Sequence, residues 1–406
     1  MEIRGMREAE IEAMIGLQCL TNRPDGHERY TRYIRGDSSY ELDQTRVVVV
    51  GGRIVSTLRV WDRQMRIGPS AVRTGGIGGV CTHPEHRKKG YASAMMRDAI
   101  EWLRQSGYEV GVLFSEIPFV FYRRLGWECL PQAGFHIKRQ QVVGLQETDW
   151  QIEPFEEELD LEDAAALYDV YNARQSGAIL RPRFHWDTAP ARIRDLFPTV
   201  VARRGNTLGG FLNFLVEGTR VNVLEVAYER SDPTILAALA NHLLRCCEQE
   251  GIEEIEGEIP HRHPLVDVLV RGSVGDLSLT GKTSMMLYAV NLLSLMQKVL
   301  PELQVRLDAS GQRFAPVSLR FEINEQQCAL RLNDSGLLEV LDADPRAASS
   351  NLPGESFWRL LLGESSWSQL EPGLQAQGIS TRPEVAALMP VLFPPQEVTF
   401  WGTDHF

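Results

Sequence analysis

The feature that most restricts the fold of this chain is a strand, a basic turn and a long amphipathic helix that follow one another in its first third. The strand is expected over Ile77–Thr82. Apolar side chains then recur at offsets of 0, 3, 4, 7, 8 and 11 residues from Ala92 to Leu103, which places them on one face of a helix. Gly107 ends this helix, and a wholly apolar strand follows at Val110–Phe114. Because such strands lie in sheets covered on both faces, the segment predicts an α/β layer structure.

The elements on either side of this segment extend the pattern into three blocks. Residues 6–20 predict a helix, and strands at 47–50 and 53–60 form a hairpin around Gly51-Gly52. Beyond residue 150 the order helix, three strands, helix, strand is found again at a spacing of about 140 residues, which predicts an internal duplication. From residue 291 a helix, three strands and a second helix predict a small α+β domain. A length of 406 residues suits several domains, and the expected boundaries are 1–150, 151–290 and 291–406.

The chain is expected to reside in the cytoplasm, with no membrane partner. No window approaches about 18 uninterrupted apolar residues. The first residues, MEIRGMREAEIEAMIGL, carry charges where a signal peptide has an apolar core. The six cysteines form no Cys-x-x-Cys pair and are too sparse for a disulfide framework, which fits a reducing compartment.

The distribution of charge separates the first block from the rest. A net charge of −12 argues against a nucleic-acid partner, because duplex binders need basic faces to displace counterions. Residues 1–150 carry 21 Lys and Arg against 18 Asp and Glu, whereas the remainder carries 21 against 36. This asymmetry would suit an anionic ligand on the first block and a cationic ligand facing the remainder. Ordinary surface charge explains it equally well.

The turn between the strand and the amphipathic helix carries the chemistry. It contains Arg87, Lys88 and Lys89 and ends in Gly90. The N–H groups at a helix N-terminus attract phosphate, and a glycine lets the backbone approach a ligand closely. The pattern predicts an anion site that suits a pyrophosphate, and a solvated basic turn is the alternative.

The turn belongs to a longer motif, which reads Val80-Cys81-Thr82-x-Pro84 and then Arg87-x-x-Gly90-x-Ala92. This motif resembles the acyl-CoA motif of the GCN5-related N-acetyltransferases (GNATs). The run FVFYRRLGWE at 119–128 resembles the next motif of that family, in which a tyrosine approaches the thioester sulfur. In the family the amides of the turn hold the CoA pyrophosphate, and the preceding strand pairs with the pantetheine arm. The resemblance implies acetyl-CoA as the co-substrate and no metal.

The resemblance also assigns individual residues. It implies that Tyr122 is the general acid, which is reasonable because phenol and thiol have neighbouring pKa values of about 10 and about 8.5. It implies that the C-terminal carboxylate of Phe406 is the base. An α-carboxyl with a pKa near 3.5 is a poor base for an amine with a pKa of about 10, so we expect it to steer the ammonium and relay its proton. The donor-binding positions implied are Val80, Cys81, Thr82, Arg87, Lys88, Lys89, Gly90, Tyr91, Ala92, Ser93, Ser115 and Glu116.

The whole chain resembles the Eis-like (enhanced intracellular survival) multidomain acetyltransferases in its length, its order of blocks and its aromatic last residue. The implied fold is α/β and α+β: two tandem GNAT-like domains, then a sterol-carrier-protein-like α+β domain whose C-terminal tail reaches the active site. The second domain is expected to be degenerate, because the matching junction lacks Arg-x-x-Gly-x-Ala and places Glu229 and Asp232 where phosphate would bind. The family also implies a homo-oligomer, namely a hexamer.

These patterns predict an acetyl-CoA-dependent N-acetyltransferase that acts on a small-molecule or peptide amine. The acidic remainder favours a polycationic acceptor, such as an aminoglycoside, a polyamine or a lysine side chain. The first alternative is a small hydrophobic amine, and the second is a non-catalytic acyl-CoA-binding or lipid-binding protein. A zinc site at Cys81, His83 and His86 and a nucleophilic Cys81 are less favoured, because a strand and a turn already account for these residues.

Overall fold

The computed structural model describes residues 1–37, 39–115, 119–142, 147–186, 199–282, 285–345, 347–349, 352–379 and 381–406. They form two compact units. The first unit comprises Met1–Leu130, Ser284–Glu397 and Phe406, and the second comprises Pro131–Thr283 and Val398–His405. None of the described helices is long and apolar enough to cross a membrane.

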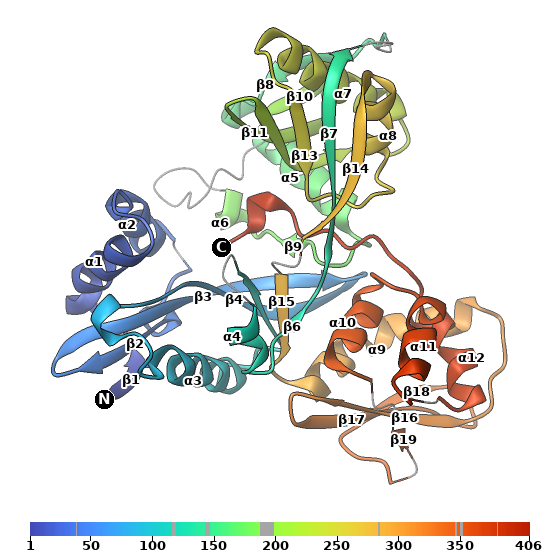
Figure 1. Ribbon diagram of the computed structural model, residues 1–406. Helices are drawn as coiled ribbons and strands as arrows, with labels where there is room; N and C mark the ends of the chain where they lie inside the picture. The colour runs from blue at the N-terminus through green and yellow to red at the C-terminus, as the bar shows by residue number, and fades with distance from the viewer. Residues whose placement is uncertain are drawn as a thin grey trace. The chain divides into compact units, whose positions relative to one another are not determined.

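The first unit is built on a sheet with the strand order β1-β2-β3-β4-β5-β15-β6 (Figure 1). Neighbouring strands are antiparallel except β4 and β5, which are parallel and are connected through helix α3. The strands are β1 (Glu2–Gly5), β2 (Thr45–Val50), β3 (Arg53–Ile67), β4 (Ser70–Thr82), β5 (Val110–Phe114), β6 (Glu128–Cys129) and β15 (Met285–Ala289). The helices are α1 (Ile11–Thr21), α2 (His27–Arg35), α3 (Tyr91–Gln105) and α4 (Val120–Arg123).

Helix α3 confirms the amphipathic helix that the apolar spacing predicts. Its apolar face is buried in a core cluster that also contains side chains of β3, β4 and β5. The helix ends before Gly107, which adopts a left-handed φ of 77°. Burial of this face holds α3 against the sheet and so fixes β4 and β5 as a parallel pair. The buried residues of the helix are Met95, Met96, Ala99, Ile100 and Leu103.

The second unit contains a sheet with the order β14-β7-β13-β12-β11-β10-β8. Its strands are antiparallel except β12 and β13, which are parallel and are connected through α7. The strands are β7 (Gln132–Val142), β8 (Gln151–Pro154), β10 (Val200–Arg204), β11 (Thr207–Glu217), β12 (Arg220–Tyr228), β13 (Glu254–Gly257) and β14 (Ser273–Lys282). The other elements are α5 (Glu157–Asn172), the short strand β9 (Ile179–Leu180), α6 (Arg183–Trp186), α7 (Pro233–Gln249) and α8 (Pro264–Arg271).

The two sheets share one topology, which confirms the predicted duplication. Read from β1 in one and from β8 in the other, each has four antiparallel strands, then a strand parallel to the fourth, then two further antiparallel strands. In each sheet a long helix, α3 or α7, connects the two parallel strands. The α/β fold class with two tandem domains of the same type is therefore correct.

The sixth strand of each sheet departs from the boundaries expected at 150 and 290. Strand β7 precedes residue 150 but pairs with β13 and β14 of the second unit, where Figure 1 shows it beside β14. Strand β15 precedes residue 290 but lies between β5 and β6 of the first unit. Every residue of β15 is buried, so the strand needs neighbours on both edges and cover on both faces. Apolarity predicts a buried strand but does not say which sheet contains it.

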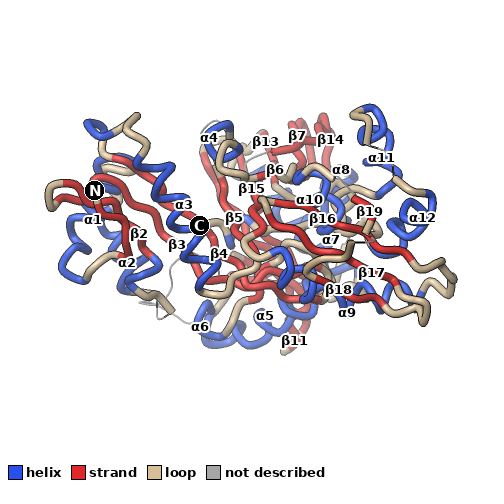
Figure 2. Tube along the Cα trace, turned by 90° about the horizontal axis from the view of Figure 1, so that it is seen from below, coloured by secondary structure: helices blue, strands red, loops and turns tan. Residues whose placement is uncertain are grey.

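Within the first unit, the described residues after 291 form helices α9 to α12 and a four-stranded sheet. The strand order of this sheet is β18-β17-β16-β19. Helix α9 (Leu292–Ala309) packs beside β17 and β18 (Figure 2). The other elements are β16 (Val317–Ile323), β17 (Gln326–Leu332), β18 (Leu338–Leu341), β19 (Ala348–Ser349), α10 (Gly354–Leu362), α11 (Trp367–Ala376) and α12 (Pro383–Leu392). The chain after α10 is largely helical despite Pro372 and Pro390, because buried apolar side chains outweigh the helix-breaking tendency of proline.

Candidate active site

The candidate site begins where β4 separates from β5. The parallel pairing runs from Thr74 with Val110 to Ile77 with Leu113 and does not continue, although β4 extends to Thr82. In the described register, the edge of residues 78–82 that faces away from β3 therefore lacks a strand partner. Backbone N–H and C=O groups along such an edge can pair with an extended amide chain.

An irregularity in β4 turns this edge away from β5. The register between β3 and β4 shifts between Thr57 and Arg59, and Gly79 adopts a left-handed φ of 61°. The side chain of Gln18 in α1 holds the shift, because its Nε2 donates to the Gly79 carbonyl at 2.6 Å. Asn22 Nδ2 in turn donates to Gln18 Oε1 at 2.7 Å. Gln18 is only 4% exposed, so a buried polar side chain fixes the conformation of the strand.

Gln18 was not among the functional residues predicted from the sequence. The feature that could have indicated it is a polar residue beside Met14, Ile15 and Leu17, on the buried part of a helix. A buried amide must find partners, so such a residue marks a specific contact. The sequence alone does not say that the partner is the Gly79 carbonyl.

The basic turn leads from the end of β4 to an uncapped helix. Lys88 and Gly90 both have left-handed backbones, with φ of 61° and 82°. Residues 87–90 are exposed, and among the described residues no side chain caps the first turn of α3. Successive N–H groups in such a turn, together with the N-terminus of a fifteen-residue helix, attract an anion. Arg87 Nε donates to the Thr82 carbonyl at 3.3 Å and ties the turn to the strand.

Space for a ligand is available at Gly90. A Cβ added there would meet no described atom within 4 Å, so the turn is open on that side. The next positions, Tyr91, Ala92 and Ser93, are half-buried in the first turn of α3. Val80, Thr82 and Tyr91 are likewise half-buried, and Val80 and Tyr91 pack against the core cluster that α3 covers. The predicted donor-binding positions of the strand and the turn are thus contiguous.

The other predicted positions lie at the ends of the following elements. Ser115 directly follows β5 and is half-buried, whereas Glu116 lies outside the described residues. Tyr122 in α4 is 6% exposed and packs in the same core cluster as Met95, Met96 and Leu113. Burial raises the pKa of Tyr122 to about 12, so the phenol keeps its proton at neutral pH.

Phe406 lies against the strand that carries the donor positions. Its ring packs on Gly76 and meets the Phe114 ring at a centroid distance of 5.5 Å. Its carboxyl carbon is 3.1 Å from where a Cβ of Gly78 would stand, and Trp61 Nε1 is 3.2 Å from that point. The glycines at 76 and 78 therefore leave room for the last residue. The run GGIGGV places four glycines toward the end of the strand, but the sequence alone does not indicate that the last residue packs on them.

The ring of Trp61 stacks on Arg59, which forms a buried ion pair. The Arg59 guanidinium carbon lies 3.5 Å from the Trp61 ring centroid, and Arg59 Nη2 donates to Asp37 Oδ2 at 2.5 Å. Burial lowers the pKa of Arg59 to about 10 while the charge of Asp37 opposes that shift, so the guanidinium keeps its proton at neutral pH. This stacking keeps the indole N–H beside the terminal carboxyl group.

The same region offers little support for metal or thiolate chemistry. Burial raises the pKa of Cys81 to about 11, so its thiol is protonated at neutral pH and is a weak nucleophile. In the described ranges, His, Cys, Asp and Glu side chains form no group of three or more that could hold a metal ion. The described groups gathered in this region are instead backbone amides, the Tyr122 phenol and the carboxyl group of Phe406.

A family comparison covers the part of the chain that contains this region. Residues 2–130 match the acetyltransferase (GNAT) domain family. These residues are a GNAT acetyltransferase domain. The domain contains β1 to β6 and α1 to α4, with the strand end, turn and helix described above. The chain is accordingly an N-acetyltransferase. A comparison with curated protein sequences gives no match.

Solved structures resemble the full length of the chain. A probable N-acyltransferase from Enterococcus faecalis V583 has a TM-score of 0.77 at 17% identity and covers 100% of this chain and 99% of its own. A GCN5-related N-acetyltransferase from Anabaena variabilis has a TM-score of 0.72 at 16% identity, with 100% of both chains covered. Eis1 from Mycobacterium abscessus has a TM-score of 0.64 at 17% identity, again with 100% of both covered. The chain thus shares its fold with these solved structures over its full length.

Proposed function

We propose that the chain transfers the acetyl group of acetyl-CoA to a primary amine where β4 leaves β5. The observation that carries this proposal is the position of the Phe406 carboxyl group beside Gly78, on the strand that leads into the uncapped turn. A carboxylate near a thioester is suited to receive an ammonium group. The donor would lie along Val80–Thr82, with its pyrophosphate on Lys88–Ser93, and Ser115 would be a further donor-binding residue.

Tyr122 would serve as the general acid. When the amine nitrogen forms a bond to the acyl carbon, the carbon–sulfur bond breaks and the thiolate needs a proton. The buried phenol is protonated at neutral pH, which supplies that proton. The same desolvation that raises the pKa of Tyr122 would raise the pKa of the departing thiol, so the two stay matched. The phenolate then recovers a proton from water.

The Phe406 carboxylate would bind the amine as an ammonium and relay its proton. An α-carboxyl group with a pKa near 3.5 is ionised at neutral pH but is too weak a base to hold the proton of an amine. We therefore assign it the role of placing the amine and passing its proton to water. Trp61 Nε1 lies on the same side of Gly78 and would help to orient the carboxylate.

The acceptor that we propose is polycationic: an aminoglycoside, a polyamine or a lysine side chain of a peptide. The excess of acids after residue 150 and the terminal carboxylate support this class. A small hydrophobic amine is the second candidate, because the rings of Trp61, Phe114 and Phe406 lie around the same point of β4.

The second unit would not bind acetyl-CoA. Its matching helix α7 has a capped N-terminus, since Asp232 Oδ1 accepts from the Thr234 N–H at 3.0 Å. The carboxylate therefore occupies the place that phosphate would take in α3 and repels an anion. We retain the sterol-carrier-like assignment of residues 291–406, the hexamer and the cytoplasmic location as predictions.

The experiment is thiol release from acetyl-CoA with a panel of amines: spermidine, an aminoglycoside, a lysine peptide and an arylalkylamine. Selective turnover with the first three supports the polycationic class, and selective turnover with the last supports the hydrophobic class. The matched variant carries extra residues after Phe406, which moves the carboxylate away and should abolish turnover while retaining CoA binding. CoA binding without release for any amine would instead favour a non-catalytic acyl-CoA-binding protein.

A further inference from the structure

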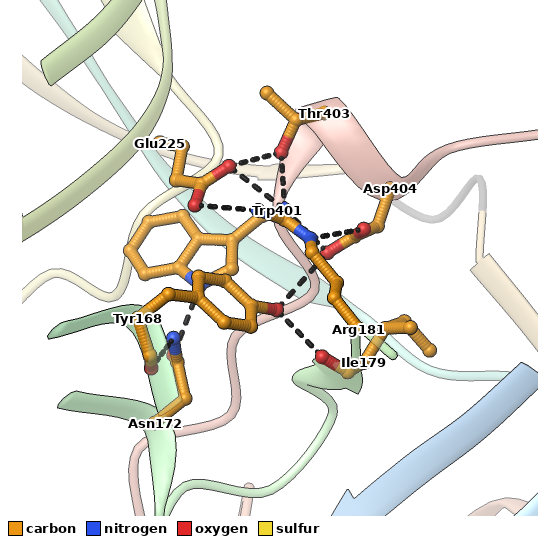
Figure 3. A network of polar contacts seen from close by, with 8 residues as sticks. All are labelled: Tyr168, Asn172, Ile179, Arg181, Glu225, Trp401, Thr403 and Asp404. Atoms are coloured by element: carbon orange, nitrogen blue, oxygen red, sulfur yellow. Dashed lines mark hydrogen bonds and ion pairs between the residues drawn. The ribbon is translucent and has the colours of Figure 1, made fainter. Parts of the chain in front are cut away.

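The last residues of the second unit are held by a buried ionic network (Figure 3). Its centre is Arg181, whose side chain is fully buried. Arg181 Nε and Nη2 donate to the two carboxylate oxygens of Asp404, each at 2.9 Å. Its Nη1 and Nη2 donate to the two oxygens of Glu225 at 3.0 and 2.8 Å. One guanidinium thus joins a carboxylate of the tail to a carboxylate of β12 by two bidentate pairs.

Neighbouring residues of the tail join the same network. Thr403 Oγ1 accepts from Arg181 Nη2 at 2.8 Å and donates to Glu225. The hydroxyl of Tyr168 contacts Asp404 Oδ2 at 3.3 Å, and its ring lies 4.0 Å from the Arg181 guanidinium carbon. We call Arg181, Glu225, Thr403 and Asp404 the tail network.

Contacts before the tail network fix the course of the chain toward it. The indole N–H of Trp401 donates to Asn172 Oδ1 at 3.0 Å, and Trp401 is 1% exposed. The Thr399 N–H donates to the Ser176 carbonyl at 2.8 Å. The Asp404 N–H donates to the Trp401 carbonyl at 2.9 Å and closes a short turn. Residues 399 to 404 therefore have specific polar partners at both ends and in the middle.

A network of this kind specifies position more than it adds stability. Buried charges lose their hydration, so hydrophobic residues of similar volume often stabilise a core as well. Removing one partner is costly, however, because it leaves a charge buried and unpaired. The docked position of Asp404 is thus strongly preferred over alternatives. Only His405 separates Asp404 from Phe406, and two Cα–Cα steps span about 7.6 Å at most.

We propose that Arg181, with Glu225, is a positioning residue that fixes the C-terminal carboxylate for catalysis through its contacts with Asp404 and Thr403. The role rests on the proposed function, in which that carboxylate receives the amine. Arg181 does not touch the reacting atoms in this account. It limits the freedom of the last two residues, so the carboxylate is already placed when the acceptor arrives.

The first test measures the tail directly and requires no activity. Carboxypeptidase removes Phe406 only when the last residues detach, so the release rate reports the detached population. We expect Asp404→Asn, which keeps the shape of the side chain, and Arg181→Met to accelerate release at least about tenfold. The control is Tyr171→Phe, which removes a buried hydrogen bond of 2.6 Å to His263 in the same unit but outside the tail network. Equal release from wild type and Asp404→Asn would overturn the proposal.

The second test is a double-mutant cycle on kcat with a version that lacks Phe406. If Asp404 acts through the carboxylate, Asp404→Asn lowers kcat in the full chain but has little further effect once Phe406 is removed. An equal loss in both backgrounds would mean a merely structural role and would overturn the proposal. If removing Phe406 leaves kcat unchanged, the proposed function of the carboxylate fails, and the positioning role fails with it. The carboxypeptidase result would still show whether the network anchors the tail.

Discussion

Single atoms decide how the last residue fits onto β4. The ring of Phe406 occupies the space where a side chain at 76 would stand, and its carboxyl carbon occupies the space beside 78. Each of these positions must be a glycine for a steric reason, since the φ of neither is in the left-handed region. The same two residues make the strand end narrow enough for an aromatic terminus to lie over it.

Gly78→Ala should therefore displace the carboxylate without disturbing the donor turn. The new Cβ would stand 3.1 Å from the carboxyl carbon, so the terminal carboxyl group would have to move by a few tenths of an ångström. We expect kcat to fall about tenfold or more, with CoA affinity nearly unchanged. Gly16→Ala is the matched control, because a Cβ there meets nothing within 4 Å. Equal kcat in the two variants would contradict this account.

Tyr122→Phe should lower kcat about 100-fold or more, because it removes the proton donor and keeps the packing of the ring. The pKa of about 12 means that the wild-type phenol loses its proton only as the pH rises through that value. The pH profile of wild-type kcat should accordingly show no alkaline loss from this group below about pH 10. A descending limb at lower pH that disappears in Tyr122→Phe would show that the tyrosine ionises earlier than its burial implies.

At the scale of elements, α1 and α3 act on β4 from different positions. Helix α3 presents its uncapped N-terminus after the strand, and α1 supplies the amide of Gln18 that holds the irregularity at Gly79. The corresponding helix of the second unit, α7, is capped by Asp232. The two copies of the fold thus differ at this point: the helix N-terminus lacks a side-chain cap in α3 and has one in α7.

Gln18→Leu should weaken acetyl-CoA binding, because the Gly79 carbonyl loses its partner and the strand edge shifts. We expect the dissociation constant, measured by calorimetry with CoA, to rise about tenfold. Asn22→Ala, which removes only the outer contact at 2.7 Å, should have a smaller effect of the same sign. Unchanged CoA affinity in Gln18→Leu, in a protein that melts as a single transition, would exclude a role in donor binding.

The elements that periodicity reveals could be predicted, and the contacts between distant residues could not. The spacing from Ala92 to Leu103 identifies α3, and the apolar run at Val110–Phe114 identifies β5. The strand, turn and helix that carry the proposed donor-binding positions could be predicted because their residues are contiguous. Gln18 and Gly79 are remote in sequence, and Arg181 alone suggests an exposed charge. Their pairing depends on burial, which only the folded chain establishes.

For the whole molecule, the exchange of β7 and β15 means that neither sheet is encoded by one continuous segment. The GNAT domain match ends at residue 130, yet β5 and β6 pair with β15 at 285–289. The last residues of the chain are likewise divided between the units: Val398–His405 belong to the second unit and Phe406 to the first. The location of β15 was not predictable, because its apolar residues fit any buried strand.

A fragment of residues 1–150 should therefore fail to fold as a monomer. Without β15, the strand β5, which is buried except at its last residue, exposes one edge and its apolar side chains. We expect aggregation or a molten state, detected by size-exclusion chromatography and near-UV circular dichroism. Addition of residues 284–290 through a flexible linker after residue 130 is the matched rescue. A monomeric 1–150 fragment that binds CoA would contradict the requirement for β15.

The late position of β15 in the sequence also affects how the chain folds during its synthesis. When Cys129, the last residue of β6, leaves the ribosome, β5 still lacks the neighbour that lies between it and β6. At about 5–20 residues per second, the interval until β15 is made is about 10–30 s. During this interval the nascent chain exposes an apolar strand edge that other chains can bind. An early segment of the chain therefore lacks its strand neighbour until a much later segment has been translated.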